Sequence, residues 1–346
     1  MRGGPASWVA VLAMAVIVLV SGGCGRHAGA PAPAPRPAQG HVATGVRVGG
    51  QSVGGMTASD AAAVIRGLAA DADRMPRDAY VDPNTHGLVP GVAGVRLNVA
   101  ATLREVLAAR RDADLSPITE SLTPAVNLSD LPPAPIYNGS PTRPEVAFVI
   151  NVAWGEPYIP GMLRTLAAER APVTFCLVGR WAEAHPDLVR AMVTAGQHAG
   201  TPYAFCNHGY RDHGWALLSQ AQAYASITAA DRVISGLTGA SPLYFSPHRG
   251  EFNPAVLAAS RRTGHDLVLW SLDTIDWKNP PAAEMRERIV SRAKAGDIVL
   301  MHPTAPTEQA LAGMIQGVRA KGLKLVTLDT LLASNGTPGR SNPVAG

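Results

Sequence analysis

The sequence has little charge and few cysteines, and no part of it is densely basic. Only 16% of the 346 residues are charged, and the formal net charge is +4. Because no run of lysine and arginine is dense enough to bind a phosphate backbone, we expect no nucleic-acid partner. The apolar residues, 47% of the chain, are numerous enough to form one large core and a smaller one, so we expect two domains.

The apolar run at the amino terminus is too short to span a membrane comfortably. Residues 8–20 provide about thirteen apolar residues, whereas a spanning helix needs about twenty. Arg2 before this run and the small residues 21–23 after it give the layout of a secretory signal, so we expect an exported protein. Cys24 follows directly, as in a bacterial lipoprotein signal, and we expect it to be lipidated and to hold the chain at the outer face of the membrane. The residue three positions before Cys24 is not the usual leucine, so cleavage without lipidation and an uncleaved anchor stay open.

Two further cysteines lie in the body of the chain, Cys176 and Cys206. An oxidising compartment would permit a disulfide between them. Cys176 lies within the apolar run 173–178, where a buried free thiol behaves as a small hydrophobic side chain. We expect a free thiol, with the disulfide as the alternative.

Proline marks the segments between the expected domains. The first of these segments alternates proline with alanine and therefore forms an extended linker. Short strands and two amphipathic helices follow, the first with Thr57 as its N-cap, and they predict a small α+β domain. We divide the chain into a secretory or lipoprotein signal, a linker, the small domain, a Pro-rich linker, a larger domain and a flexible tail, at residues 1–24, 25–41, 42–126, 127–144, 145–334 and 335–346.

From residue 145 the pattern changes to buried strands that alternate with amphipathic helices. The expected strands are 146–152, 173–178, 243–245, 267–272, 298–302 and 324–327. The expected helices are 159–170, 181–195, 216–237, 254–263, 282–295 and 308–321. Strands separated by helices of this length pair in parallel with right-handed crossovers. We therefore predict an α/β fold in which a distorted barrel follows the small α+β domain.

Two of these strands end in titratable side chains that can act in catalysis. Asp273 and Asp276 come at the end of strand 267–272, and His302 ends strand 298–302. Because α/β enzymes present their functional groups at the carboxyl edge of the sheet, we expect these side chains to meet there.

Several ordered blocks resemble the polysaccharide deacetylase (NodB-homology, carbohydrate esterase 4) family over residues 145–334. They are Val-Thr-Phe at 173–175, Asn-His-Gly-Tyr at 207–210, Phe-Ser-Pro at 245–247, and the blocks around Asp276 and His302. The stretch 151–160 is similar to a sporulation-associated branch of deacetylase-like proteins. The resemblance implies a distorted (β/α)7-type NodB barrel. Over a short Gly-rich motif, residues 42–126 also resemble a peptidoglycan-binding domain of VanW-like and YoaR-like proteins, with a generic packing module as the alternative.

The resemblance implies metal-dependent hydrolysis of N-acetyl groups, which requires a metal, a base, an acid and a pocket for the methyl group. The base position falls on Asn151 and a metal-ligand position on Val152. Asparagine cannot take up a proton usefully near neutral pH, and valine cannot bind a metal. Asn151 is therefore an altered base position, with a hydrogen-bonding strand end as the alternative.

By the same resemblance, His208 and His213 would bind a divalent metal, for which zinc is the expectation because imidazole nitrogen is a usual zinc ligand. Asp212 between them could replace the missing carboxylate. The spacing of the two histidines exceeds that of the family by one residue, and residues 201–206 look like a further insertion. A polar surface loop without metal is the alternative.

His302 would be the general acid, with Asp273 or Asp276 favouring the protonated imidazole that a leaving amine requires. Trp277 and Leu300 would wall the acetyl-methyl pocket.

Ser246 takes the place of the family's arginine, and the neighbouring Arg249 and His248 could supply a displaced cation or a further imidazole. Trp154, Trp181 and Trp270, together with Trp277, could stack on sugar rings or pack in the barrel core.

The sequence thus predicts an exported hydrolase that acts on N-acetyl groups of cell-wall glycan through an altered site. The alternative is a catalytically inactive relative that binds peptidoglycan or another glycan. In both cases the expected partners are cell-wall glycan and the membrane, the latter through Cys24.

Overall fold

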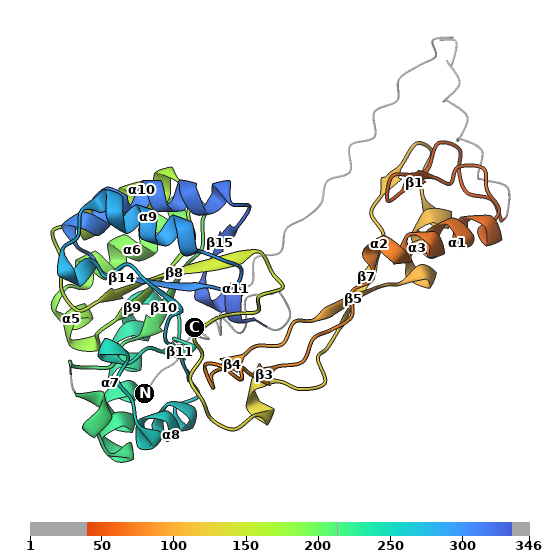
Figure 1. Ribbon diagram of the computed structural model, residues 1–346. Coiled ribbons are helices and arrows are strands. Elements are labelled where there is room, and N and C mark those ends of the chain that lie inside the picture. The colour runs from red at the N-terminus through yellow and green to blue at the C-terminus, as the bar shows by residue number, and fades with distance from the viewer. Residues whose placement is uncertain (1–39, 213, 334–346) are drawn as a thin grey trace, which may run out of the picture.

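The computed structural model describes residues 40–212 and 214–333 (Figure 1). The predicted signal, Cys24, His213 and the tail at 335–346 lie outside the described residues, as does nearly all of the first linker. Within the described ranges, no helix is both long and apolar enough to cross a membrane.

The larger part of the molecule is a curled sheet of parallel strands with helices around it (Figure 1). The strands lie in the order β12 (Asp266–Leu267), β11 (Tyr244–Phe245), β10 (Tyr203–Asn207), β9 (Val173–Leu177), β8 (Glu145–Val152), β14 (Ile298–Met301) and β13 (Leu272–Asp273). A further strand, β15 (Lys324–Val326), pairs with the start of β8. The helices are α4 (Ile159–Ala168), α5 (Gly179–Ala184), α6 (Pro186–Ala199), α7 (Gln220–Thr238), α8 (Pro254–Arg262), α9 (Ala282–Arg292), α10 (Ala305–Ala320) and α11 (Leu328–Leu332). The predicted distorted α/β barrel is confirmed.

A single segment of the chain connects the two edge strands of the curled sheet. Strands β12 and β13 stand at opposite ends of the strand order, yet only four residues separate them in sequence. Between them, Ile136 forms a parallel bridge with Val268 and accepts a hydrogen bond from the Leu269 amide. The continuous strand predicted at 267–272 is therefore wrong: the segment pairs first with β11, then with Ile136, and last with β14. This change of partner distorts the barrel.

The alternation of side chains along β8 determines what each residue faces. Ala147 and Val149 pack with Cys176 and Cys206 in one buried cluster. Ile150 and Val152 point to the opposite face of the sheet and pack in the other main cluster, which contains helix residues. Because successive side chains of a strand point to opposite faces, Asn151 shares the face of Val149.

Two further elements differ from the prediction. Residues 201–206 are not an insertion, because β10 pairs residue for residue with β9 in the middle of the sheet. The helix expected at 181–195 is two helices, since α5 ends at Ala184 and Pro186 begins α6. Proline excludes the helical conformation from the residue before it, and His185 has φ −128° and ψ 54°.

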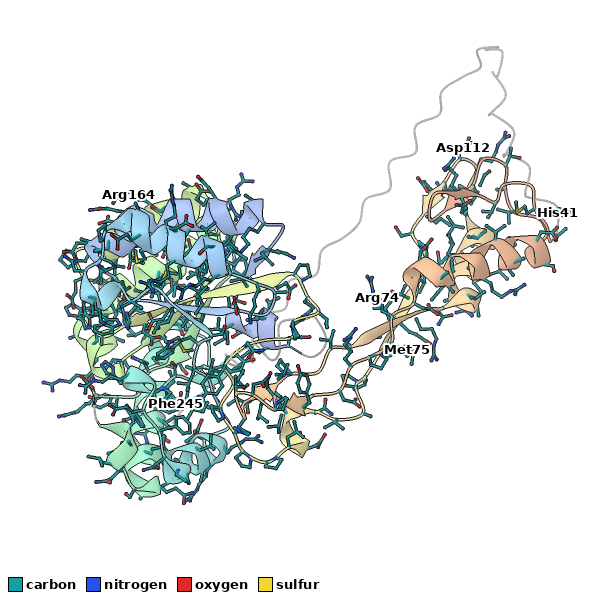
Figure 2. All side chains as sticks on the ribbon, viewed as in Figure 1. His41, Arg74, Met75, Asp112, Arg164 and Phe245 are labelled. Atoms are coloured by element: carbon teal, nitrogen blue, oxygen red, sulfur yellow. A yellow bond between two sulfur atoms is a disulfide. The ribbon has the colours of Figure 1, made fainter. Side chains whose placement is uncertain are left out.

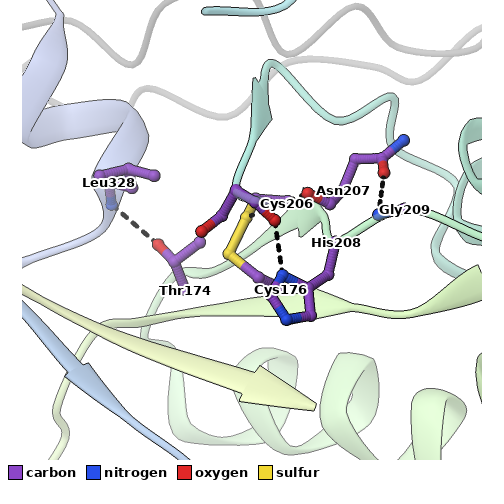
Figure 3. Close-up of a disulfide and its surroundings, with 8 residues drawn as sticks. Thr174, Cys176, Cys206, Asn207, His208, Gly209 and Leu328 are labelled. Atoms are coloured by element: carbon purple, nitrogen blue, oxygen red, sulfur yellow. Dashed lines mark hydrogen bonds between the residues drawn. A yellow bond between two sulfur atoms is a disulfide. The ribbon is translucent and has the colours of Figure 1, made fainter. Parts of the chain in front are cut away.

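Cys176 and Cys206 form a disulfide, so the expectation of a free thiol is wrong (Figure 3). The two residues are directly opposite each other in the register of β9 and β10, and their Cα atoms are 4.3 Å apart. A separation of this size is within reach of a disulfide bridge. The bond joins the two central strands just before the loop that carries His208.

The smaller part of the molecule has a core of its own. Strands β1 (Arg47–Val48), β2 (Gln51–Ser52) and β6 (Asp114–Leu115) form a sheet, accompanied by the helices α1 (Ala58–Gly67), α2 (Ala69–Ala72) and α3 (Val99–Ala108). Thr57 is the N-cap of α1 as predicted, because its side chain accepts a hydrogen bond from the Asp60 amide. This core contains both short strands and helices, as a small α+β unit requires.

An extended arm connects this core to the barrel (Figure 1). Strands β5 (Gly94–Leu97) and β7 (Thr119–Leu122) pair near the small core, and β3 (Tyr80–Val81) pairs with β4 (Leu88–Val89) beside the barrel. Arg74 and Met75 lie on the arm between the two parts (Figure 2), and Met75 is 79% exposed. Leu88 packs in the same buried cluster as Ile136 and residues of the barrel. The arm thus reaches the barrel wall, while the domain boundaries at 126 and 144 stay predictions.

Candidate functional site

A cavity of about 440 Å³ lies where β8, β10, β13 and β14 end. Its polar lining residues are Asn151, His208, His248, Arg249, Asp273 and His302. Its apolar lining residues are Ala153, Trp154, Trp270, Trp277 and Leu300. The structure thus brings together, at the expected edge of the sheet, most of the residues that the sequence singled out.

Asn151 presents an unsatisfied polar atom at this cavity. Its side chain is buried, and its Oδ1 atom has no hydrogen-bond partner among the described residues. A buried carbonyl oxygen without a donor costs about 1–3 kcal/mol, unless a ligand or water supplies the donor. The role of Asn151 as an altered base position stays a prediction. Val152 faces the helix-side core and is 0% exposed.

His302 is held by Asp276. Its Nδ1 atom lies 2.8 Å from Oδ1 of Asp276, which is almost fully buried. The other carboxylate oxygen of Asp276 accepts hydrogen bonds from the His302 amide and from Oγ1 of Thr307, the latter at 2.8 Å. Because Asp276 engages Nδ1, the Nε2 atom of His302 is left for the cavity. Asp276 positions His302 and does not itself line the cavity.

Asp273 lies on the cavity wall, and of Asp273 and Asp276 it is the one that lines the cavity. Its Oδ1 atom accepts a hydrogen bond of 2.7 Å from the Ile275 amide, and burial raises the pKa of Asp273. Ile275 has φ +57°, an uncommon conformation for a β-branched residue. This turn lets the chain direct Asp273 to the cavity and Asp276 beneath His302.

His208 is buried at the base of the cavity in a defined tautomer. Its Nδ1 atom lies 2.6 Å from the carbonyl oxygen of Ser246, which can only accept, so Nδ1 carries the hydrogen. The lone pair of Nε2 is thereby left unprotonated. Burial, with a smaller effect from the neighbouring His248, lowers the pKa of His208 to about 3. His208 is therefore a neutral hydrogen-bond acceptor or ligand across the physiological range.

The loop after β10 is fixed by Asn207. Its Oδ1 atom accepts a hydrogen bond of 2.6 Å from the Gly209 amide (Figure 3), and its Nδ2 atom donates to Ile227 O and to Asp231 Oδ1, both at 2.8 Å. These three bonds hold the turn that begins with His208.

The described residues do not fit a family-type metal site. Oδ2 of Asp212 lies 3.3 Å from Nε2 of His248 and 3.6 Å from Nη2 of Arg249, so this carboxylate contacts His248 and forms an ion pair with Arg249 at the rim. Val152, at the expected ligand position, lies in the core. Across 40–212 and 214–333, no group of three His, Cys, Asp or Glu residues could hold a metal ion. His213 lies outside these ranges, so its metal role stays a prediction.

The predicted sugar-binding residues divide into two groups. Trp277, 59% exposed, and Trp154, 43% exposed, both line the cavity, and Trp154 stacks on His302 with an interplanar angle of 8°. Leu300 is a buried wall residue, and Arg249 lies at the rim. Ser246 contributes its backbone carbonyl to His208 instead of lining the cavity.

Trp181 is buried in the core and donates a hydrogen bond to Glu156, so it is not a sugar platform. Thr307, whose hydroxyl group donates a hydrogen bond to Asp276, was not predicted from the sequence. No local sequence signal could have found it, because the contact spans 31 residues.

Comparisons with known proteins agree with this architecture. The family model for polysaccharide deacetylase matches residues 138–268. The uncharacterized protein YlxY of Bacillus subtilis is 30% identical over 257 residues, which cover 74% of this chain and 78% of that protein. A peptidoglycan-N-acetylglucosamine deacetylase of Bacillus cereus is 30% identical over 181 residues, or 51% of this chain and 82% of that enzyme. Among solved structures, BA3943 from Bacillus anthracis, a CE4 family pseudoenzyme, aligns with a TM-score of 0.67 and 28% identity over 79% of this chain and 95% of that one.

Proposed function

Since the chain belongs to the polysaccharide deacetylase family, we propose that its cavity binds N-acetylated cell-wall glycan without hydrolysing it. One observation carries this proposal. Hydrolysis requires a carboxylate base at the inward-facing position at the end of β8. This position holds Asn151, whose carboxamide Oδ1 atom has no hydrogen-bond partner among the described residues. A carboxamide can bind an acetamide group but cannot take a proton from water near neutral pH.

The side chains at two of the expected ligand positions support the same proposal. Valine at position 152 has no ligand atom, and Asp212 is engaged with His248 and Arg249 at the rim. Hydrolysis of this kind relies on a metal to activate the carbonyl of the acetyl group and the attacking water.

The remaining groups suit an N-acetylated sugar. An acetamide has one N–H donor, one carbonyl acceptor and a methyl group, and the cavity offers amide and imidazole groups beside the apolar wall of Leu300. The exposed rings of Trp154 and Trp277 can stack on the apolar faces of sugars. A few convergent polar groups among aromatic side chains are typical of a small-molecule site.

We further propose that the protein works outside the cytoplasm, as a lipoprotein on the outer face of the membrane or as a secreted protein. The disulfide between Cys176 and Cys206 supports this, because such bonds persist in oxidising compartments. The layout of residues 1–24 supports it independently.

A metal-dependent N-deacetylase, with zinc as its metal, is the second candidate. It is favoured by the preserved pair of Asp276 and His302, which has the geometry of a positioned general acid. This candidate needs a water-activating group other than Asn151.

The two candidates separate in one experiment on the purified full chain. N-acetylglucosamine oligomers and peptidoglycan are incubated with and without added Zn²⁺, and acetate release is measured beside binding by calorimetry. We expect binding without acetate release. Acetate that is released by the native protein and lost in His302→Ala would overturn the proposal in favour of the deacetylase. The variant Asn151→Asp serves as the matched comparison, because it places a carboxylate at the inward-facing position that lines the cavity.

A further inference from the structure

Trp154 lies on the turn between β8 and α4, at the edge of the cavity. Its indole lines the cavity, is 43% exposed and stacks on His302 with the ring centroids 5.9 Å apart. An exposed aromatic side chain on a mobile loop loses conformational freedom when it binds a ligand, and this loss weakens the affinity. A turn that is fixed before the ligand arrives avoids most of this loss, so the contacts that hold the turn bear on binding.

The turn is held on one side by the loop after β14. Gly155 follows Trp154 directly, is buried and has φ +94°. A Cβ atom at this position would overlap the carbonyl oxygen of Pro303, which is the residue next to His302. Glycine is the residue that accepts both this φ and so close an approach. The backbone of the turn therefore packs directly on the segment that carries His302.

Glu156 holds the turn on its other side, against α5. Its Oε1 atom accepts a hydrogen bond of 2.6 Å from Nε1 of Trp181 and lies 3.3 Å from Nε2 of His185. Trp181 is 6% exposed and packs in the main core, so the partner of Glu156 is itself held in place. Burial disfavours the charged carboxylate, but hydrogen bonds from the Glu156 amide and from Trp181 outweigh it and keep the pKa of Glu156 below its ordinary value. A charged acceptor makes this hydrogen bond a strong one.

The helix that receives this anchor also contacts the loop after β10. The Gly179 amide at the start of α5 donates a hydrogen bond of 2.9 Å to the carbonyl oxygen of Gly209. The Arg180 amide donates one of 2.9 Å to the carbonyl oxygen of Tyr210. The carboxylate anchor thus ties the turn to a helix that is itself bound to the loop carrying His208.

We propose that Glu156 is a positioning residue for glycan binding, which holds the Trp154 indole in place to stack on a sugar ring of the N-acetylated strand. This inference rests on the proposed function. Glu156 does not line the cavity, so it acts through the ring of Trp154 and not through a contact of its own. Its bond to Trp181 and the packing of Gly155 restrict two successive residues of the turn, directly after the ring that they hold.

The test measures the binding of N-acetylglucosamine oligomers to the full chain by calorimetry. Glu156→Ala should weaken binding about two- to tenfold, because the released ring has to be ordered when the ligand binds. Glu156→Gln keeps an oxygen acceptor for the Trp181 N–H group and should restore most of the lost affinity. The control is Asp187→Ala, at a 96% exposed acid in the first turn of α6, which should bind like the native chain. Thermal melting of each variant confirms that it is folded.

A double-mutant cycle separates positioning from a general effect on the fold. Glu156→Ala is combined with Trp154→Ala, and each variant is compared with its parent. We expect Glu156→Ala to lower the affinity of the native chain and to have no effect when Trp154 is absent, since the carboxylate acts through this ring. A general effect would lower the affinity by the same factor in both backgrounds. Chemical-shift titrations by NMR extend the measurement to the weaker binding of the double variant.

The outcomes separate the two proposals. If the native chain binds no oligomer, the proposed function fails and this inference fails with it. If the native chain binds, but Glu156→Ala keeps the full affinity or loses the same factor in both backgrounds, only the positioning role is refuted. Affinity that Glu156→Gln does not restore would overturn the hydrogen bond to Trp181 as the anchor of the turn.

Discussion

The carboxylate of Asp276 lies beneath the imidazole of His302, with 2.8 Å between Oδ1 and Nδ1. The two residues belong to different strand ends, β13 and β14, which pair in parallel. The same carboxylate also accepts a hydrogen bond from the hydroxyl group of Thr307 in α10. A single buried acid therefore fixes one wall of the cavity to both the sheet and a helix.

We expect Asp276→Asn to lower the free energy of unfolding by about 1–3 kcal/mol. One carboxylate oxygen, which now accepts hydrogen bonds, would be replaced by an NH2 group that cannot accept them. Chemical denaturation measures the change. Asp187→Asn is the control, since the Asp187 side chain is 96% exposed in the first turn of α6 and contacts only Arg190 among the ion pairs of the described residues. Equal stability of both variants would show that these hydrogen bonds do not hold the site.

We expect the double variant Cys176→Ala with Cys206→Ala to lose about 3–4 kcal/mol of stability, as the loop-closure model gives for a loop of this length. The two cysteines are 30 residues apart in sequence. Denaturant titrations of the native chain and of the double variant, each with and without a reductant, provide the measurement. The reductant should destabilise the native chain and leave the double variant unchanged; an equal response of both would contradict the prediction.

Stability should fall as the pH is lowered from 7 to 5. Burial lowers the pKa of His208 to about 3, whereas in the unfolded chain histidine titrates near its ordinary value of about 6.5. Between these values only the unfolded state takes up the proton. The contribution of His208 is therefore fully present above about pH 6.5 and is lost as the pH falls toward 3, and the loss amounts to about 2 kcal/mol at pH 5.

Denaturation curves across this range test the prediction. His208→Gln should flatten the dependence on pH. It should not abolish it, because burial also lowers the pKa of His248. His86→Gln, at an exposed histidine of the arm, should keep the full slope. If the slopes of the native chain and of His208→Gln coincide, the acid sensitivity has another origin.

Trp277→Ala should weaken the binding of N-acetylglucosamine oligomers about three- to tenfold and change stability by less than about 0.5 kcal/mol. The ring is 59% exposed and lines the cavity, with the ammonium group of Lys278 4.9 Å from its centroid. Leu217→Ala, at a side chain that is 89% exposed outside the cavity, should change neither quantity. Calorimetry and thermal melting provide the two measurements. An unchanged affinity in Trp277→Ala would exclude this ring from the glycan site.

The strand ends were predictable because hydrophobic runs that stop at polar groups are a local signal. Asp273 and His302 lie where the sequence placed them, and both line the cavity. Strand β10 was missed because the altered spacing around His208 suggested an insertion, and only its pairing with β9 shows that residues 203–207 are a central strand. The disulfide was missed for the same reason, since the register that brings Cys206 opposite Cys176 is a property of the pairing.

The sequence by itself determined the alternation of strands and helices, and with it the barrel, because hydrophobic periodicity is local and repeats along the chain. Only the tertiary structure decided which carboxylate supports His302 and that Asp212 contacts His248 at the rim. These relationships join residues far apart in sequence, and they are fixed by strand register and side-chain direction, which no local pattern encodes.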